Sequence, residues 1–168
     1  MSGGGARQGC GAIDISLAKV FGFVGALSFV VEGILLPVTP AAHVILFASY
    51  LWAMRRFCIE RRRHLALWVA TAIAASAATL YATGMTPVNL LFRRAPLEAL
   101  ALVALLWGIS ALPFYAVNDP LYKATGDYKF RLAWISYAAG ATLFVANVGF
   151  IALAYAFLVL ALAFLNLK

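Results

Sequence analysis

The chain has few charged residues and few of the side chains that form catalytic or metal sites. Charged residues make up 11% of its 168 residues, and it contains only two cysteines and two histidines. Cys10 and Cys58 lie far apart in the sequence and form no metal-ligand spacing. We expect His43 near one face of the protein and His64 near the other, so they cannot ligate one haem from both sides.

Recognisable catalytic motifs are also missing from the sequence. It has no Cys-x-x-Cys-His, no His-Glu-x-x-His and no glycine-rich phosphate loop, and its serines lack a matching histidine–aspartate arrangement. We therefore expect a protein that is not an enzyme and that binds no cofactor or metal ion.

What the chain has instead is apolar sequence, with 65% hydrophobic residues and a mean hydropathy of +0.94. Short breaks, several of them marked by proline or glycine, divide it into six stretches of about 20 residues, the length that crosses a bilayer as a helix. We place the spans at 16–36, 38–54, 65–81, 97–115, 132–148 and 149–167. The sequence thus predicts an all-α, polytopic transmembrane bundle at 13–168, preceded by a flexible cytoplasmic tail at 1–12.

The last two spans form an uncharged run at 132–167, which could also be one long tilted helix. Asn147 and Gly149 provide the only turn signal in this run. A single helix of this length would reach about 54 Å, well beyond a hydrocarbon core of roughly 30 Å. A hairpin is therefore the favoured interpretation.

The distribution of lysine and arginine predicts the orientation. If the N-terminus is cytoplasmic, only Arg93 and Arg94 lie outside and eleven cations lie inside. These eleven are Arg7, Lys19, Arg55, Arg56, Arg61, Arg62, Arg63, Lys123, Lys129, Arg131 and Lys168. We therefore expect a multi-pass protein of the cell membrane with both termini in the cytoplasm.

The densest cationic segment joins the second and third spans. Its arginines are Arg55, Arg56, Arg61, Arg62 and Arg63. A juxtamembrane cluster of this kind anchors the topology and attracts anionic lipid headgroups, by about 1 kcal/mol per cation. An acidic soluble partner is an alternative. The net charge of +7 arises largely from such anchors, so we expect no nucleic-acid partner.

Glu32 is the best candidate for an ionisable group inside a span, and such groups often mark ion pathways. The tight hairpin between the first two spans could bring Glu32 close to His43. The alternative, which we favour, places Glu32 near the headgroups and His43 at the membrane interface.

Small residues are frequent in the first, third and fifth spans. Gly22 and Gly25 lie in the first span, and Gly140 and Gly149 lie in the last hairpin. Small residues let membrane helices approach closely, so we expect these glycines to serve in helix packing.

Several segments resemble an archaeal multi-pass membrane family known as domain of unknown function 996. They are LAKVFGFVG at 17–25, the end of the second span at 50–56, TGDYKF at 125–130, and the uncharged hairpin of Gly140 and Gly149. The segment at 93–96 departs from the family pattern. The resemblance implies a compact helical bundle in an archaeal cytoplasmic membrane. It implies no catalytic residues, because the family has no assigned activity.

Two functional hypotheses follow from the sequence. The first is a non-catalytic accessory subunit that packs against other integral membrane subunits of a larger complex, such as a respiratory or energy-transducing one. The alternative is a small oligomeric transporter or channel with Glu32 and His43 in its pathway.

Overall fold

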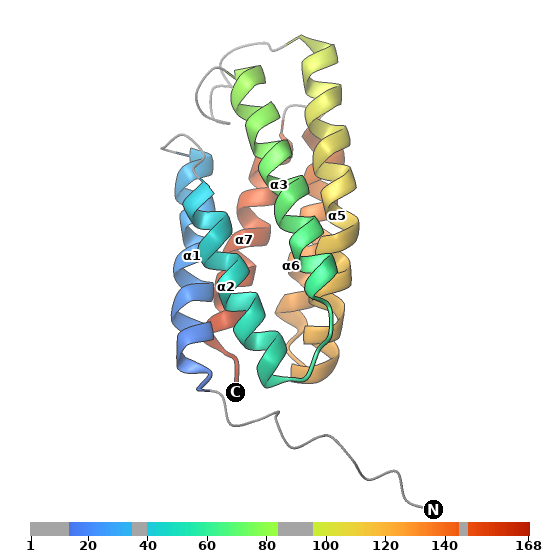
Figure 1. Cartoon of the computed structure of the whole chain (residues 1–168). Coiled ribbons are helices and arrows are strands. Elements are labelled where there is room, and N and C mark those ends of the chain that lie inside the picture. Colours follow the sequence, from blue (N-terminus) through green and yellow to red (C-terminus); the bar gives the residue numbers. More distant parts are fainter. Residues whose placement is uncertain (1–13, 35–39, 84–95, 145–147) are drawn as a thin grey trace, which may run out of the picture.

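The computed structural model describes residues 14–34, 40–83, 96–144 and 148–168, and these residues form six helices and no strand (Figure 1). The helices are α1 (Ser16–Ile34), α2 (Pro40–Arg56), α3 (Arg62–Thr83), α5 (Leu97–Thr125), α6 (Tyr128–Leu143) and α7 (Gly149–Leu165). The prediction of an all-α fold is confirmed for this part of the chain. The tail predicted at 1–12 lies outside it.

The helices form a closed ring with antiparallel neighbours (Figure 1). In ring order they are α1, α2, α3, α5, α6 and α7, and α7 packs back against α1. The contact between α2 and α3 is the smallest in the ring. Because the chain runs up and down in this way, the first residues of α1 and the C-terminus lie at the same end of the bundle (Figure 1).

The run at 132–167 contains two helices, α6 and α7, which pack side by side. Their backbones come closest where Gly140 faces Gly149. A Cβ atom on Gly149 would overlap the carbonyl oxygen of Gly140, and one on Gly140 would lie 2.9 Å from the carbonyl oxygen of Gly149. The hairpin interpretation is therefore correct, and glycine at both positions permits the close approach.

Two helices differ clearly from the predicted spans. Helix α5 continues ten residues beyond the predicted end at 115, through Pro113 and Pro120, and α6 begins at Tyr128 rather than at 132. Each internal proline removes only one helical hydrogen bond, and the surrounding turns keep the helix intact. The chain reverses at Gly126, whose φ of 70° is a left-handed conformation suited to glycine.

The other helix ends lie closer to the predicted ones. Helix α2 ends two residues after the predicted end at 54, and α3 starts three residues before 65 and ends two after 81. The last helix ends two residues before 167. Residues 35–36 of the first predicted span, 38–39 of the second and 145–147 of the fifth lie outside the described residues. Such small differences are usual because helix ends fray.

Aromatic side chains fill the centre of the ring. Phe114 of α5 contacts Trp68 of α3 and Tyr137 of α6, with ring centroids 5.0 Å and 4.4 Å apart. Phe29 of α1 stacks on Phe157 of α7 at 4.2 Å. Aromatic pairs in these geometries add about 0.5–1.5 kcal/mol each beyond the apolar area that they bury. The core is therefore a packed aromatic cluster that connects opposite sides of the ring.

Candidate functional site

His43 lies inside the bundle, on α2, and only 1% of its surface is exposed. Its Nε2 atom lies 3.4 Å from the hydroxyl oxygen of Ser76 on α3, and the edge of its ring meets Phe29 of α1 at a centroid distance of 4.4 Å. His43 is thus a buried residue at the meeting point of three helices. The depth at the membrane interface that we favoured for His43 from the sequence stays a prediction.

Glu32 belongs to the last turn of α1, three residues after Phe29. Its side chain lies outside what the structure describes, so the pairing of Glu32 with His43 stays a prediction. The structure does place their two helices side by side, because α1 packs along α2 (Figure 1).

A network of buried polar side chains links four helices of the ring. Tyr50 of α2 donates to Oδ1 of Asn118 on α5 at 2.8 Å. The indole N–H of Trp107 on α5 donates to the hydroxyl oxygen of Thr79 on α3 at 3.0 Å. The hydroxyl groups of Ser110 on α5 and Tyr137 on α6 are 2.7 Å apart.

This network was not predicted from the sequence, because hydroxyl groups in helices often bond only to carbonyl groups of their own helix. Thr79 and Ser110 do donate to carbonyl groups of their own helices, those of Ala75 and Trp107, and they also bond across to a neighbouring helix. The spacing of Trp107, Ser110 and Asn118 along one face of α5 is the signal that could have revealed it.

The basic segment between α2 and α3 forms a second candidate site. Helix α2 ends in a Schellman motif, in which Cys58 has a φ of 56° and the N–H of Ile59 donates to the carbonyl oxygen of Met54 at 2.8 Å. Helix α3 begins three residues later, at Arg62. The tight turn therefore brings cationic residues from both helices to one end of the bundle.

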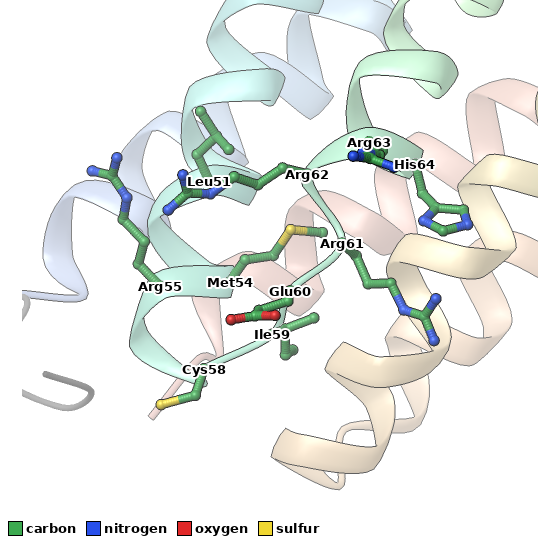
Figure 2. Close-up of a pocket in the computed structure, with 10 residues that line it drawn as sticks. All are labelled: Leu51, Met54, Arg55, Cys58, Ile59, Glu60, Arg61, Arg62, Arg63 and His64. Carbon is green, nitrogen blue, oxygen red and sulfur yellow. The ribbon is translucent and has the colours of Figure 1, made fainter. Parts of the chain in front are cut away.

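A hollow of about 720 Å³ lies at this turn, with Leu51, Met54 and Ile59 among its apolar lining (Figure 2). Its charged and titratable lining consists of Arg55, Glu60, Arg61, Arg62, Arg63 and His64. The side chains of Arg55 and Arg61 extend to opposite sides (Figure 2). Because these cations spread around the hollow, the arrangement suits a broad anionic surface better than one small ligand.

The predicted arginines of this segment thus share one end of the molecule, and Arg56 joins them as the last residue of α2. All ten lysines and arginines of the described residues lie towards this same end, at the start of α1, α3 and α6 or the end of α2, α5 and α7. At the opposite end, Glu98 lies in the first turn of α5. Arg7, Arg93 and Arg94 lie outside the described residues.

The predicted packing glycines of α1 contact different helices. A Cβ atom on Gly22 would overlap the ring of Phe164 on α7. One on Gly25 would lie 3.0 Å from the backbone nitrogen of Leu46 on α2. The two positions thus allow α1 to approach both of its neighbours in the ring.

Two helices, α3 over Arg62–Tyr81 and α5, are long and apolar enough to cross a membrane, and α1 and α7 contain shorter apolar segments. Length and composition alone also fit the core helix of a soluble protein. In these two helices, however, only 33% and 39% of the residues in the apolar window are buried. More than half of the residues in these windows are therefore exposed or partly exposed.

The described residues contain no group of three or more His, Cys, Asp or Glu side chains that could hold a metal ion. No family model, curated protein or solved structure matches the chain. Its relation to the archaeal family therefore stays a prediction.

Proposed function

We propose that this chain is a multi-pass protein of the cell membrane that serves as a non-catalytic subunit beside other integral membrane proteins. The observation that carries the proposal is the apolar exterior. On α5 alone, Leu102, Leu105, Ile109 and Leu112 are exposed, whereas Ser110 and Asn118 are buried. Soluble monomers rarely expose apolar patches larger than a few hundred Å², but lipid covers such surfaces without cost.

The charge distribution supports six spans with both termini in the cytoplasm. The cations of the described residues gather at one end of the bundle, as expected where short cytoplasmic loops hold lysine and arginine. The six helices lie side by side along one axis, and α3 and α5 extend farther at the top of the view than α1 and α2 do (Figure 1). Helices α2 and α6 are less apolar than α5, and the ring buries His43 and Ser49 of α2.

A subunit role is supported by the outer face of α3. Ala66, Ala70, Ala74 and Ala77 are all exposed on this helix, while Ala72 and Ala75 pack inside the ring. Exposed small residues three or four positions apart allow another membrane helix to approach closely. The aromatic filling of the ring also favours a rigid packing element over a conducting pore.

Gentle detergent extraction from native membranes, followed by native electrophoresis and mass spectrometry, tests this proposal. We expect stoichiometric migration with a larger membrane complex. Migration of the chain alone, or as a small homo-oligomer, would contradict the subunit role.

Substitutions on α3 show whether its outer face makes the contact. We expect the double variant Ala70→Leu, Ala74→Leu to fold and to leave the complex, because the added side chains block close approach. Ile73→Leu, an exposed substitution on the same helix that conserves volume, serves as the control and should stay bound. Retention of the double variant would place the contact elsewhere.

The buried position of His43 favours a second candidate function, proton or ion transport. Proton flux in vesicles containing the purified protein tests it, with Glu32→Gln as the variant and Glu98→Gln as the control. Helix ends place both glutamates at the same end of the ring, and Glu98 is exposed. Flux that Glu32→Gln abolishes and Glu98→Gln preserves would support transport. Absence of flux in the unmodified protein would contradict proton transport.

A further inference from the structure

A groove of about 530 Å³ runs along the outer junction of α5 and α6. Ala111, Leu112 and Ala138 line its apolar part, and Trp134 contacts Tyr115 edge-on at a centroid distance of 4.8 Å. The lining also includes Asp119, Lys123 and Arg131, which lie towards the cationic end of the bundle. The groove thus has an apolar length and a charged mouth.

The charged mouth leaves one cation without a carboxylate partner. Lys123 forms an ion pair with Asp119 at 2.7 Å. Arg131 is exposed, lies over the ring of Tyr122 at 5.9 Å, and has no salt bridge within the part of the chain that the structure describes. Because the charges of Lys123 and Asp119 cancel, Arg131 gives the mouth a net positive charge. This charge suits a singly charged anion such as a phosphodiester.

The length of the groove matches half a bilayer. Lys123 at the mouth and Ala111 at the far end are twelve residues apart on α5. At 1.5 Å per residue this separation is about 18 Å, close to half of a hydrocarbon core of roughly 30 Å. One chain of a lipid from a single leaflet would fill this length.

We propose that the groove binds one anionic phospholipid of the cytoplasmic leaflet. The phosphate lies at the guanidinium group of Arg131, and one lipid chain lies against Ala111 and Ala138. Basic pockets between membrane helices on the cytoplasmic side have the chemistry to recognise such headgroups. The inference rests on the proposed membrane location and names a specific ligand for the exterior of α5 and α6.

This site differs from the hollow between α2 and α3. There, the arginines spread over an open surface and attract anions by charge alone (Figure 2). In the groove, Arg131 and the ion pair of Lys123 with Asp119 lie at the end of an apolar channel with an aromatic wall. We therefore expect the groove to discriminate between lipids and the hollow to respond mainly to overall charge.

Tryptophan fluorescence measures this binding directly, because brominated lipid chains quench only nearby indoles. The full-length protein is placed in phosphatidylcholine vesicles that contain either brominated phosphatidylglycerol or brominated phosphatidylcholine. Quenching is also measured in the variant Trp134→Phe. The part of the quenching that is lost in this variant comes from lipid in the groove. One cation near the surface contributes about 1 kcal/mol, so we expect a preference of about fivefold for the anionic lipid.

Arg131→Gln should reduce this preference to about one, whereas Arg55→Gln, the same charge change at the same end of the bundle, should preserve it. Equal losses in both variants, or no loss in Arg131→Gln, would overturn the proposal.

Ala138→Phe should displace the lipid chain and lower the quenching of Trp134 by both brominated lipids. Ala139→Phe, whose position is exposed outside the groove, should not.

An alkaline carbonate wash of the same vesicles distinguishes a failure of the proposed lipid site from a failure of the proposed membrane location. A protein that stays in the vesicles but shows no Arg131-dependent preference overturns the lipid site alone. A protein that the wash removes overturns the membrane location as well.

Discussion

Gly149 and Gly140 stand where the backbones of α6 and α7 come closest. A methyl group at Gly149 would overlap the carbonyl oxygen of Gly140 and lie 2.8 Å from the Cα atom of Phe144. We expect Gly149→Ala to lower the free energy of unfolding by about 2–3 kcal/mol, the usual range for overpacking against rigid neighbours. Circular dichroism during a titration with dodecyl sulfate in mixed micelles measures the change.

Gly108 provides a matched control on α5, because a Cβ atom there would meet nothing within 4 Å. We expect Gly108→Ala to leave the stability unchanged or to raise it by up to about 1 kcal/mol. Equal effects of the two substitutions would contradict the close packing of α6 and α7.

Tyr50 and Asn118 are both fully buried, and their hydrogen bond joins α2 to α5 across the ring. Tyr50→Phe removes this bond and leaves Oδ1 of Asn118 without its donor. We expect a loss of about 1 kcal/mol in the free energy of unfolding, within the range for interhelical hydrogen bonds in membrane proteins. Tyr81→Phe, at a side chain that is 90% exposed, should change stability by less than the experimental error. A loss of similar size at Tyr81 would show that the hydrogen bond is not the cause.

Sequence patterns could predict the packing glycines as small residues but not their partners. Whether Gly22 packs on α2 or on α7 depends on the order of helices in the ring, which a hydropathy pattern does not contain. The same limit applies to the bond between Tyr50 and Asn118, because these residues lie 68 positions apart. Such pairs depend on the tertiary arrangement, and neither residue has a local motif that signals it.

The turn between α5 and α6 depends on two adjacent residues. Gly126 ends α5 in a left-handed conformation, and the carboxylate of Asp127 accepts a hydrogen bond from the N–H of Lys129 at 2.9 Å. A Cβ atom at Gly126 would meet no neighbour, so the cost of a side chain there comes from the backbone alone. We expect Gly126→Ala to destabilise the protein by about 1 kcal/mol in the same titration.

Asn tolerates the left-handed conformation better than Ala does, so Gly126→Asn should cost less than Gly126→Ala. If the two variants lose the same amount, the left-handed backbone at this turn is not the reason for glycine.

The existence of the helices could be predicted from the sequence better than their ends. Each predicted span contains most of one helix, because long apolar runs leave few other structures. The last ten residues of α5 were missed because they contain Asn118, Asp119, Pro120 and Lys123, which resemble a polar loop. In the structure, Asp119 and Lys123 form a salt bridge within the helix, and Asn118 bonds inwards to Tyr50.

At the scale of the whole molecule, polar and charged side chains are distributed unevenly, both across the bundle and along its axis. Across the ring, several polar side chains, such as Tyr50, Ser110 and Asn118, are buried with hydrogen-bond partners, while many large apolar side chains are exposed. Along the axis of the bundle, the cations of the described residues gather at one end. Both distributions fit a bundle that crosses a bilayer with its cationic end in the cytoplasm. The sequence predicted the second distribution directly, because alternate connections are basic and the helices are antiparallel.

The position of the connection at 84–95 relative to the C-terminus tests this topology most directly. A site for a specific protease is inserted after Pro87 in one full-length variant and after Lys168 in another, and the protease is added outside sealed vesicles of known orientation. In right-side-out vesicles we expect cleavage after Pro87 only, and in inside-out vesicles cleavage after Lys168 only. Cleavage of both variants from the same side would contradict a six-span protein with its cationic end in the cytoplasm.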